Sequence, residues 1–154
     1  TDTERSISLE NSALLNAAYR TLKDPIQRAE YLVRLEAGAV KEIRNQPPAD
    51  LFEEILSLQD DLEAFRAAHG QPSADLTALR TKLQTDREAL ERRQQDMESR
   101  LFDLFETWDR LQRLSEPTEA IRAKKESVLK EMRELLSNRT YVRNIINDLI
   151  ATVG

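Results

Sequence analysis

A seven-residue apolar repeat near the end of the chain is the feature that most limits its fold. Its members follow one another at constant spacing: Ile121, Val128, Leu135, Val142 and Leu149. A second row, four residues further on, contains Met132, Ile146 and Val153 and is interrupted by Lys125 and Arg139. Such a repeat is the buried seam of a long helix that packs nearly parallel or antiparallel to other helices. The sequence therefore predicts a long helix in a bundle, beginning near Pro117.

Two further helices complete the predicted bundle. One spans about residues 50–68 and ends at His69-Gly70-Gln71-Pro72, and the other is capped by Ser73 and reaches about Leu114. Apolar residues of the second are spaced mostly by three, four or seven: Leu76, Leu79, Leu83, Leu90, Met97, Leu101, Leu104, Trp108 and Leu111. Because the connections are short, neighbouring helices should be antiparallel. We expect an all-α fold with an antiparallel three-helix bundle over residues 50–154.

Two shorter helices precede the bundle and meet at a tight corner. They cover about residues 9–23 and 25–36, and Gly38 follows as a natural stop. Asp24 can cap the second helix, and Pro25 suits its first position, where no backbone N–H is needed. Gln27 completes a capping-box pattern with Asp24. We assign residues 1–38 to a small N-terminal lobe and residues 39–49 to a linker, since two consecutive prolines there exclude a helix.

The composition argues against several classes of function. The 154 residues include no cysteine, which removes disulfides, thiolate metal sites and cysteine nucleophiles. A net charge of −5 argues against a broad nucleic-acid surface, and no apolar run reaches membrane-spanning length. We therefore expect a cytoplasmic protein with neither nucleic acid nor membrane among its partners.

The chain also lacks the patterns of an enzyme. Carboxylate-bridged metal centres in helical bundles use Glu-x-x-His pairs, but Arg66 stands three residues before the only histidine, His69. Glycine-rich phosphate loops and nucleophile elbows are missing as well. We expect neither an enzyme nor a metal or cofactor site.

One helix carries an apolar pair away from its core face. At roughly 100° per residue, the core stripe of the helix over residues 50–68 is formed by Leu51, Ile55, Leu58, Leu62 and Phe65. Phe52 and Leu56 fall about 100–140° from that stripe, and Asp60 extends their line by one turn. Acidic residues surround them, which suits a partner with apolar and basic groups. Packing of this pair against the N-terminal lobe or the last helix explains the pattern equally well.

Three segments of the chain resemble the HscB family, J-type co-chaperones of iron–sulfur cluster assembly. Residues 14–35, LLNAAYRTLKDPIQRAEYLVRL, resemble the closing helices of its J-domain. Residues 51–65, LFEEILSLQDDLEAF, resemble the first helix of its C-terminal bundle, and the helical hairpin that follows matches that bundle in length and order. The resemblance makes residues 1–38 the remnant of a J-domain and residues 50–154 a scaffold-binding bundle.

The resemblance also implies partners and site residues. Such a co-chaperone binds the iron–sulfur cluster scaffold protein and delivers it to a DnaK-type (HscA-like) chaperone, whose ATPase the J-domain stimulates. By alignment with the family, the scaffold-binding positions are Phe52, Glu53, Leu56, Ser57, Asp60 and Tyr141. Glu53 replaces a usual methionine and Ser57 a usual acid. We therefore expect a scaffold contact that is weaker or is centred on the apolar pair.

One part of the family pattern does not occur in this sequence. The chaperone-stimulating His-Pro-Asp motif is not present in this chain. The J-domain is thus incomplete, and we expect its front to precede residue 1. A generic coiled-coil adaptor or structural protein is the alternative function. It would explain the heptads but not the corner or the apolar pair, and the solution mass would separate a monomeric bundle from an elongated dimer.

Overall fold

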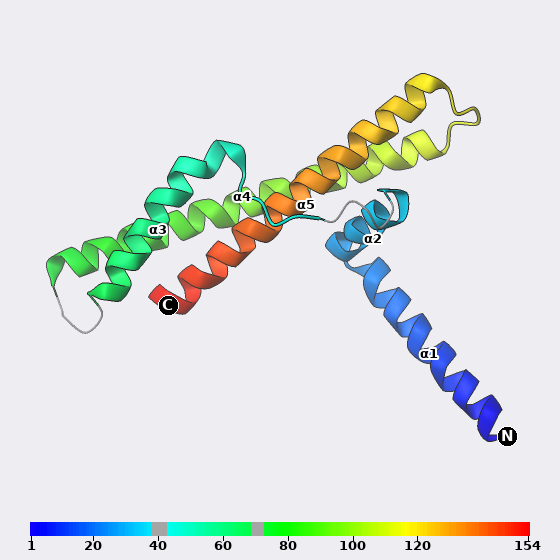
Figure 1. Ribbon diagram of the computed structural model, residues 1–154, viewed down its shortest axis with the longest axis horizontal. Coiled ribbons are helices and arrows are strands. Elements are labelled where there is room, and N and C mark those ends of the chain that lie inside the picture. Colours follow the sequence, from blue (N-terminus) through cyan, green and yellow to red (C-terminus); the bar gives the residue numbers. More distant parts are fainter. Residues whose placement is uncertain (38–42, 69–72) are drawn as a thin grey trace. The chain divides into compact units, whose positions relative to one another are not determined.

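The computed structural model describes residues 1–37, 43–68 and 73–154, and these ranges contain helices but no strand. The elements (Figure 1) are α1 (Asp2–Lys23), α2 (Pro25–Ala37), the short 3-10 helix η1 (Ala49–Leu51), α3 (Phe52–Ala67), α4 (Ala74–Gln112) and α5 (Glu119–Val153). The predicted all-α fold class is therefore confirmed. The helix ends predicted at Gly38 and at His69-Gly70-Gln71-Pro72 lie outside the described residues.

The chain divides into two compact units. Unit 1 consists of residues 1–42 and 102–133, and unit 2 consists of residues 43–101 and 134–154. The end of α4 and the start of α5 thus group with α1 and α2. The domain boundaries expected from the sequence, at residues 38 and 49, stay a prediction.

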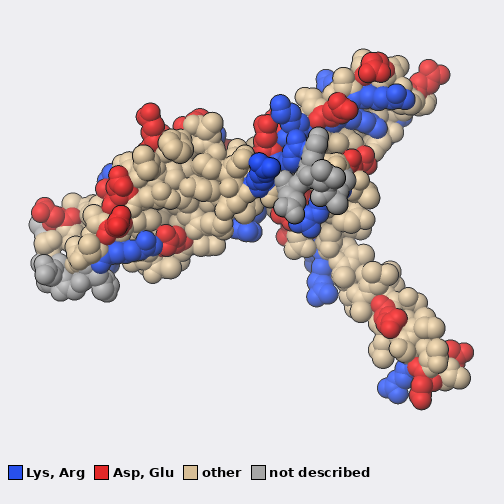
Figure 2. All heavy atoms as spheres, in the orientation of Figure 1, with Lys and Arg blue, Asp and Glu red and all other residues tan. Residues whose placement is uncertain are grey.

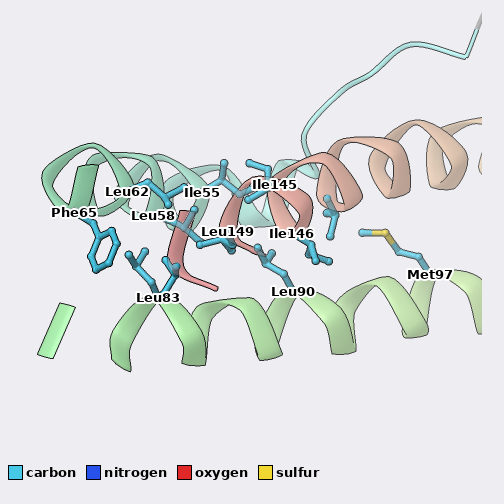
Figure 3. Close-up of a cluster of buried hydrophobic side chains, with 12 residues drawn as sticks. Ile55, Leu58, Leu62, Phe65, Leu83, Leu90, Met97, Ile145, Ile146 and Leu149 are labelled. Atoms are coloured by element: carbon cyan, nitrogen blue, oxygen red, sulfur yellow. The ribbon is translucent and has the colours of Figure 1, made fainter. Parts of the chain in front are cut away.

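Unit 2 has a continuous apolar core to which three helices contribute. Figure 3 shows side chains of α3, α4 and α5 pointing toward one another across this core. Its buried members are Ile55, Leu58, Leu62, Phe65, Leu83, Leu90, Met97, Val142, Ile145, Ile146, Leu149 and Val153. The α3 residues are those of the predicted core stripe, and those of α5 include several of its heptad positions. Burial of these periodic faces holds the three helices together.

Ion pairs show the directions in which the helices of unit 2 run. Along α3 and its preceding turn, Asp50 pairs with Arg93 and Asp61 pairs with Lys82, so α3 and α4 are antiparallel. Glu98, which follows Lys82 and Arg93 along α4, pairs with Arg139 of α5. Asp148, later in α5, pairs with Arg66 near the end of α3, and that end of α3 lies beside the earlier part of α4. Helices α4 and α5 are therefore antiparallel as well. The predicted antiparallel packing of consecutive helices, α3 with α4 and α4 with α5, is therefore confirmed within this unit.

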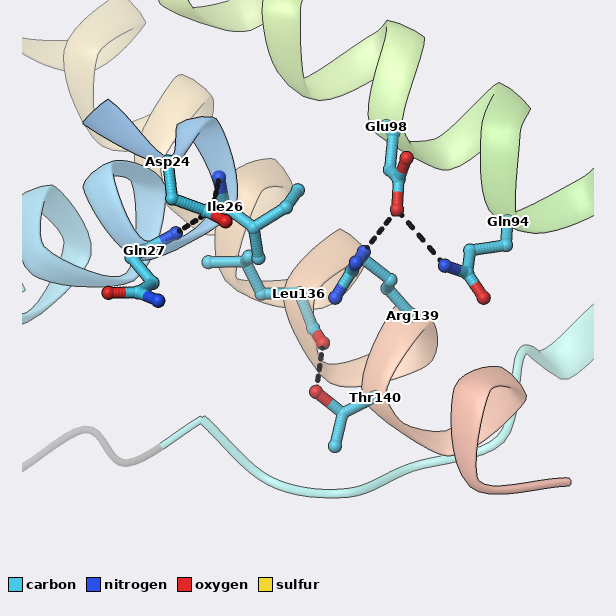
Figure 4. A network of polar contacts seen from close by, with 8 residues as sticks. All are labelled: Asp24, Ile26, Gln27, Gln94, Glu98, Leu136, Arg139 and Thr140. Atoms are coloured by element: carbon cyan, nitrogen blue, oxygen red, sulfur yellow. Dashed lines mark hydrogen bonds and ion pairs between the residues drawn. The ribbon is translucent and has the colours of Figure 1, made fainter. Parts of the chain in front are cut away.

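Arg139, which interrupts the second apolar row, lies in a partly buried polar network. The Oε1 atom of Glu98 accepts hydrogen bonds from Arg139 Nε at 2.7 Å and from Gln94 Nε2 at 3.1 Å (Figure 4). The other interruption, Lys125, belongs to unit 1, where its Nζ donates to Gln112 Oε1 at 2.8 Å. Both cations thus bind polar groups of α4, which explains why the seam tolerates them.

The corner between α1 and α2 is built largely as the sequence predicts. Asp24 Oδ1 accepts hydrogen bonds from the backbone N–H groups of Ile26 at 2.8 Å and Gln27 at 3.0 Å, and α2 begins at Pro25 (Figure 4). The second half of the expected capping box is replaced by another contact. The Asp24 N–H donates to the carbonyl of Arg20 and so closes the end of α1.

Helix α1 begins seven residues earlier than predicted. Thr1 caps it, because its Oγ1 accepts from the backbone N–H of Glu4 while the Glu4 carboxylate reaches back to Thr1. None of its residues is buried, and its apolar stripe stays exposed: Leu14, Leu15, Tyr19 and Leu22. Buried side chains of unit 1 come instead from α2, α4 and α5: Ala29, Val33, Leu104, Phe105, Trp108, Val128 and Met132.

Replacing Asp24 with alanine removes the acceptor for two backbone N–H groups of α2. We expect Asp24→Ala to lower the free energy of unfolding by about 1 kcal/mol, as measured by urea denaturation followed by circular dichroism. Asp24→Asn is the matched control, since asparagine caps helices about as well as aspartate. An equal loss in both variants would show that the cap is not the cause.

The Glu98–Arg139 pair should show strong coupling in a double-mutant cycle. Its side chains are 30% and 12% exposed, so removing either partner leaves a partly buried charge unpaired. We expect an interaction energy of about 1–2 kcal/mol from urea denaturation of both single alanine variants and the double variant. The Arg87–Glu91 pair, within α4, is the control and should give about 0.3–0.5 kcal/mol. Equal coupling in the two cycles would contradict the assignment.

Candidate protein-docking site

The off-core apolar pair of α3 is exposed in the structure. Phe52 is 57% exposed and Leu56 is 52% exposed, whereas Ile55 and Leu58 beside them are 4% exposed. Neither member of the pair therefore belongs to the core of unit 2, and the predicted exposure is confirmed. We refer to Phe52 and Leu56 as the apolar pair.

The apolar pair lies toward the α5 side of α3. Arg66 is ten residues, and thus close to three turns, after Leu56, and it donates to Asp148 Oδ1 at 2.5 Å and to Thr152 Oγ1 at 3.2 Å on α5. Gln59 lies between them along the helix and shares a pocket with residues of α5. A line from the apolar pair through Gln59 to Arg66 therefore follows the edge of α3 beside α5.

The acidic residues of this region divide into two groups. Asp50 and Asp61 face α4, where they pair with Arg93 and Lys82, and the hydrogen bond from Lys82 to Asp61 raises the pKa of the lysine. By contrast, Glu53, Asp60 and Glu63 are exposed and form no ion pair within the part of the chain that the structure describes. Figure 2 shows acidic side chains among uncharged atoms over the region of α3. The exposed acids are therefore available to a basic partner.

The sequence-predicted site residues are not all equally close to the apolar pair. Glu53 and Asp60 neighbour it on the exposed side of α3. Ser57 is also exposed, but it lies about 100° around the helix from Leu56, on the side away from α5. Their roles in binding remain predictions.

Tyr141 comes from α5 and is partly buried. It packs against the core of unit 2 and lines a pocket of about 220 Å³. The other lining residues are Asn45, Gln59, Leu62, Asn144, Ile145 and Asp148. Gln59, which is one turn after Leu56, lines the same pocket as Tyr141. The structure therefore brings Tyr141 near Leu56, the later member of the apolar pair. The pocket is named here the amide pocket, after Asn45, Gln59 and Asn144.

Sequence reasoning missed the three carboxamides of the amide pocket. Gln59 lies on the same side of α3 as the apolar pair, so a helical projection contains a signal for it. Asn45 and Asn144 offer no such signal, because one is in the segment before η1 and the other is on α5. Their proximity depends on tertiary packing.

Residues 1–37, 43–68 and 73–154 contain no group of three or more His, Cys, Asp or Glu side chains placed to hold a metal ion. Among the helices described, none combines the length and apolar character needed to cross a membrane. His69 lies outside the described residues.

Comparison with known proteins finds relatives described as co-chaperone protein HscB homologs. One from Vibrio cholerae is 37% identical over 82 residues, which cover 52% of this chain and 47% of that protein. One from Ralstonia nicotianae is 36% identical over 80 residues, covering 51% of this chain and 42% of the relative. One from Aliivibrio fischeri is 26% identical over 141 residues, covering 90% and 59% respectively. The resemblance to HscB co-chaperones is therefore confirmed.

These similarities cover only part of each relative. The chain spans about half the length of the curated relatives it matches. No family model and no solved structure matches it.

The free energy of unfolding of alanine variants can test which leucines of α3 are buried and which are exposed. We expect Leu58→Ala to lower the free energy of unfolding by about 2–5 kcal/mol, because it removes a core side chain. Leu56→Ala should change it by no more than about 0.5 kcal/mol. Urea denaturation of both variants provides the measurement. A large loss for Leu56→Ala would mean that this side chain is buried in solution.

Proposed function

We propose that this chain is part of an HscB-type co-chaperone of iron–sulfur cluster assembly and that unit 2 binds the cluster scaffold protein. The observation that carries this proposal is the exposed apolar pair, Phe52 and Leu56, on the helix that resembles the family's scaffold-binding helix. Large exposed apolar side chains one turn apart on a helix favour association with a complementary surface. Relatives described as HscB homologs support the same assignment.

The charges around the pair define the partner surface that would fit. Glu53, Asp60 and Glu63 place negative charge beside the apolar contact, while Asp50 and Asp61 are already paired within unit 2. A partner with an apolar centre and a basic rim would bury the pair and meet these acids. Charge complementarity of this kind raises the association rate and excludes acidic partners.

Delivery to a DnaK-type chaperone belongs, in this proposal, to the whole protein. The α1–α2 corner corresponds to the closing helices of a J-domain, and the His-Pro-Asp motif that acts on the chaperone is not part of this sequence. The resemblance assigns the exposed apolar stripe of α1 to contact with the preceding J-domain helices. We therefore propose that unit 2 holds the scaffold while a complete J-domain stimulates the ATPase of the chaperone.

The coiled-coil alternative has less support. Its basis was the heptad seam of α5, and those seam residues are already buried within the chain: Met132, Val142, Ile146 and Leu149. A seam that is buried internally offers no apolar stripe to another helix. A monomeric mass in sedimentation equilibrium would agree with this reading, and a tight elongated dimer would favour the adaptor.

Scaffold binding by the apolar pair can be measured by titration calorimetry. We expect Phe52→Ala/Leu56→Ala to weaken binding of the scaffold protein by about 2 kcal/mol or more, because the two side chains are the apolar anchors. Since both side chains are exposed, helical content and melting temperature should stay close to those of the unmodified chain.

The matched control removes exposed apolar surface elsewhere. Phe102 is 46% exposed and Ile150 is 47% exposed, and neither is among the assigned binding residues. Phe102→Ala/Ile150→Ala should therefore bind the scaffold protein as the unmodified chain does. Undiminished binding by the apolar-pair variant would show that the docking site has been placed wrongly.

A further inference from the structure

We propose that the amide pocket binds main-chain peptide groups of an extended scaffold segment whose side chain rests on the apolar pair. This inference rests on the proposed function, because it takes the scaffold protein as the partner. It adds a second kind of contact to the site, namely hydrogen bonds from the carboxamides of Asn45, Gln59 and Asn144.

Three separate elements contribute the carboxamides. Asn45 comes from the segment before η1, Gln59 from α3 and Asn144 from α5, and Figures 1 and 4 show the segment before η1 passing beside α5. The pocket floor is apolar, since Leu62 is 2% exposed and Ile145 is 9% exposed. Polar groups thus converge around a hollow that has an apolar base.

The hydrogen-bonding groups of the pocket are available to a partner. Within the described part of the chain, the side chains of Asn45, Gln59 and Asn144 have no protein hydrogen-bond partner, and all three residues are exposed. Among the described residues of the lining, Asp148 is the one carboxylate, and Arg66 pairs with it at 2.5 Å. The pocket therefore attracts a neutral polar group rather than a lysine or arginine side chain.

A peptide group is the neutral polar group that fits these donors and acceptors. Each carboxamide carries both N–H donors and a carbonyl acceptor, and a main-chain peptide unit presents one of each. Unpaired peptide groups of a docked segment must find partners, since burying them unpaired is costly. The carboxamides would supply these partners without requiring a particular side chain.

The spacing along α3 suits an extended segment. Gln59 follows Leu56 by about one helical turn, a rise of roughly 5 Å. Two residues of extended chain span roughly 6.6 Å, so a segment with an apolar side chain against the apolar pair brings its next peptide groups to the pocket. Tyr141, which also lines the pocket, would border this segment on the α5 side.

Calorimetry with the scaffold protein tests the pocket separately from the apolar pair. We expect Gln59→Ala/Asn144→Ala to weaken binding roughly tenfold, corresponding to two hydrogen bonds of modest net strength. The matched control is Gln95→Ala/Asn147→Ala, which removes two exposed carboxamides from α4 and α5 outside the pocket. That control should bind within about twofold of the unmodified chain.

Hydrogen exchange on the scaffold protein identifies the occupant. At saturating concentrations, the unmodified chain should protect backbone amides of one scaffold segment, and the Gln59→Ala/Asn144→Ala variant should leave those amides exchanging faster. A tenfold loss of affinity without a change in amide protection would overturn main-chain recognition and indicate a bound side chain. Unchanged affinity would overturn the role of the pocket while leaving scaffold binding intact. If the unmodified chain does not bind the scaffold protein, the proposed function fails and this inference fails with it.

Discussion

The shared apolar core of α3, α4 and α5 in unit 2 is the constraint on which the candidate site depends. Ile55, Leu58 and Leu62 reach this core together only when α3 presents one particular face to its neighbours. Because successive residues are about 100° apart, that orientation directs Phe52 and Leu56 outward. The exposure of the apolar pair is therefore a direct consequence of core burial, and Arg66 with Asp148 adds a polar contact between α3 and α5 on the same side.

Ion pairing divides the acidic residues in and just before α3 into two groups: those that bind cations within unit 2 and those that are exposed to a binding partner. Asp50 and Asp61 form ion pairs with cations of α4 across the contact between α3 and α4. Glu53 and Asp60 stay exposed beside the apolar pair. One side of this region thus carries acids that pair within unit 2, and another side carries acids that face solvent. In the proposed function, the solvent-facing acids steer a basic partner toward the apolar pair.

Much of the fold could be predicted because it follows from local periodicity and capping. The Asp24 cap and the buried heptad residues of α5 agree with their patterns. The start of α1 was predicted too late, since the capping box of Thr1 and Glu4 was not used as a signal. The grouping of the end of α4 and the start of α5 with α1 and α2 was not predictable from linker composition, because it arises from contacts between segments far apart in the chain.

For the candidate site, the sequence alone determined which face of α3 is apolar and which residues of that helix point outward. This information is local, since helical geometry relates Phe52 and Leu56 to the core stripe within a few residues. Only the tertiary structure placed Asn45, Gln59 and Asn144 around one hollow next to Tyr141. Their meeting depends on how far each helix slides along its neighbours, and interlocking side chains in the core, rather than any short motif, determine that register.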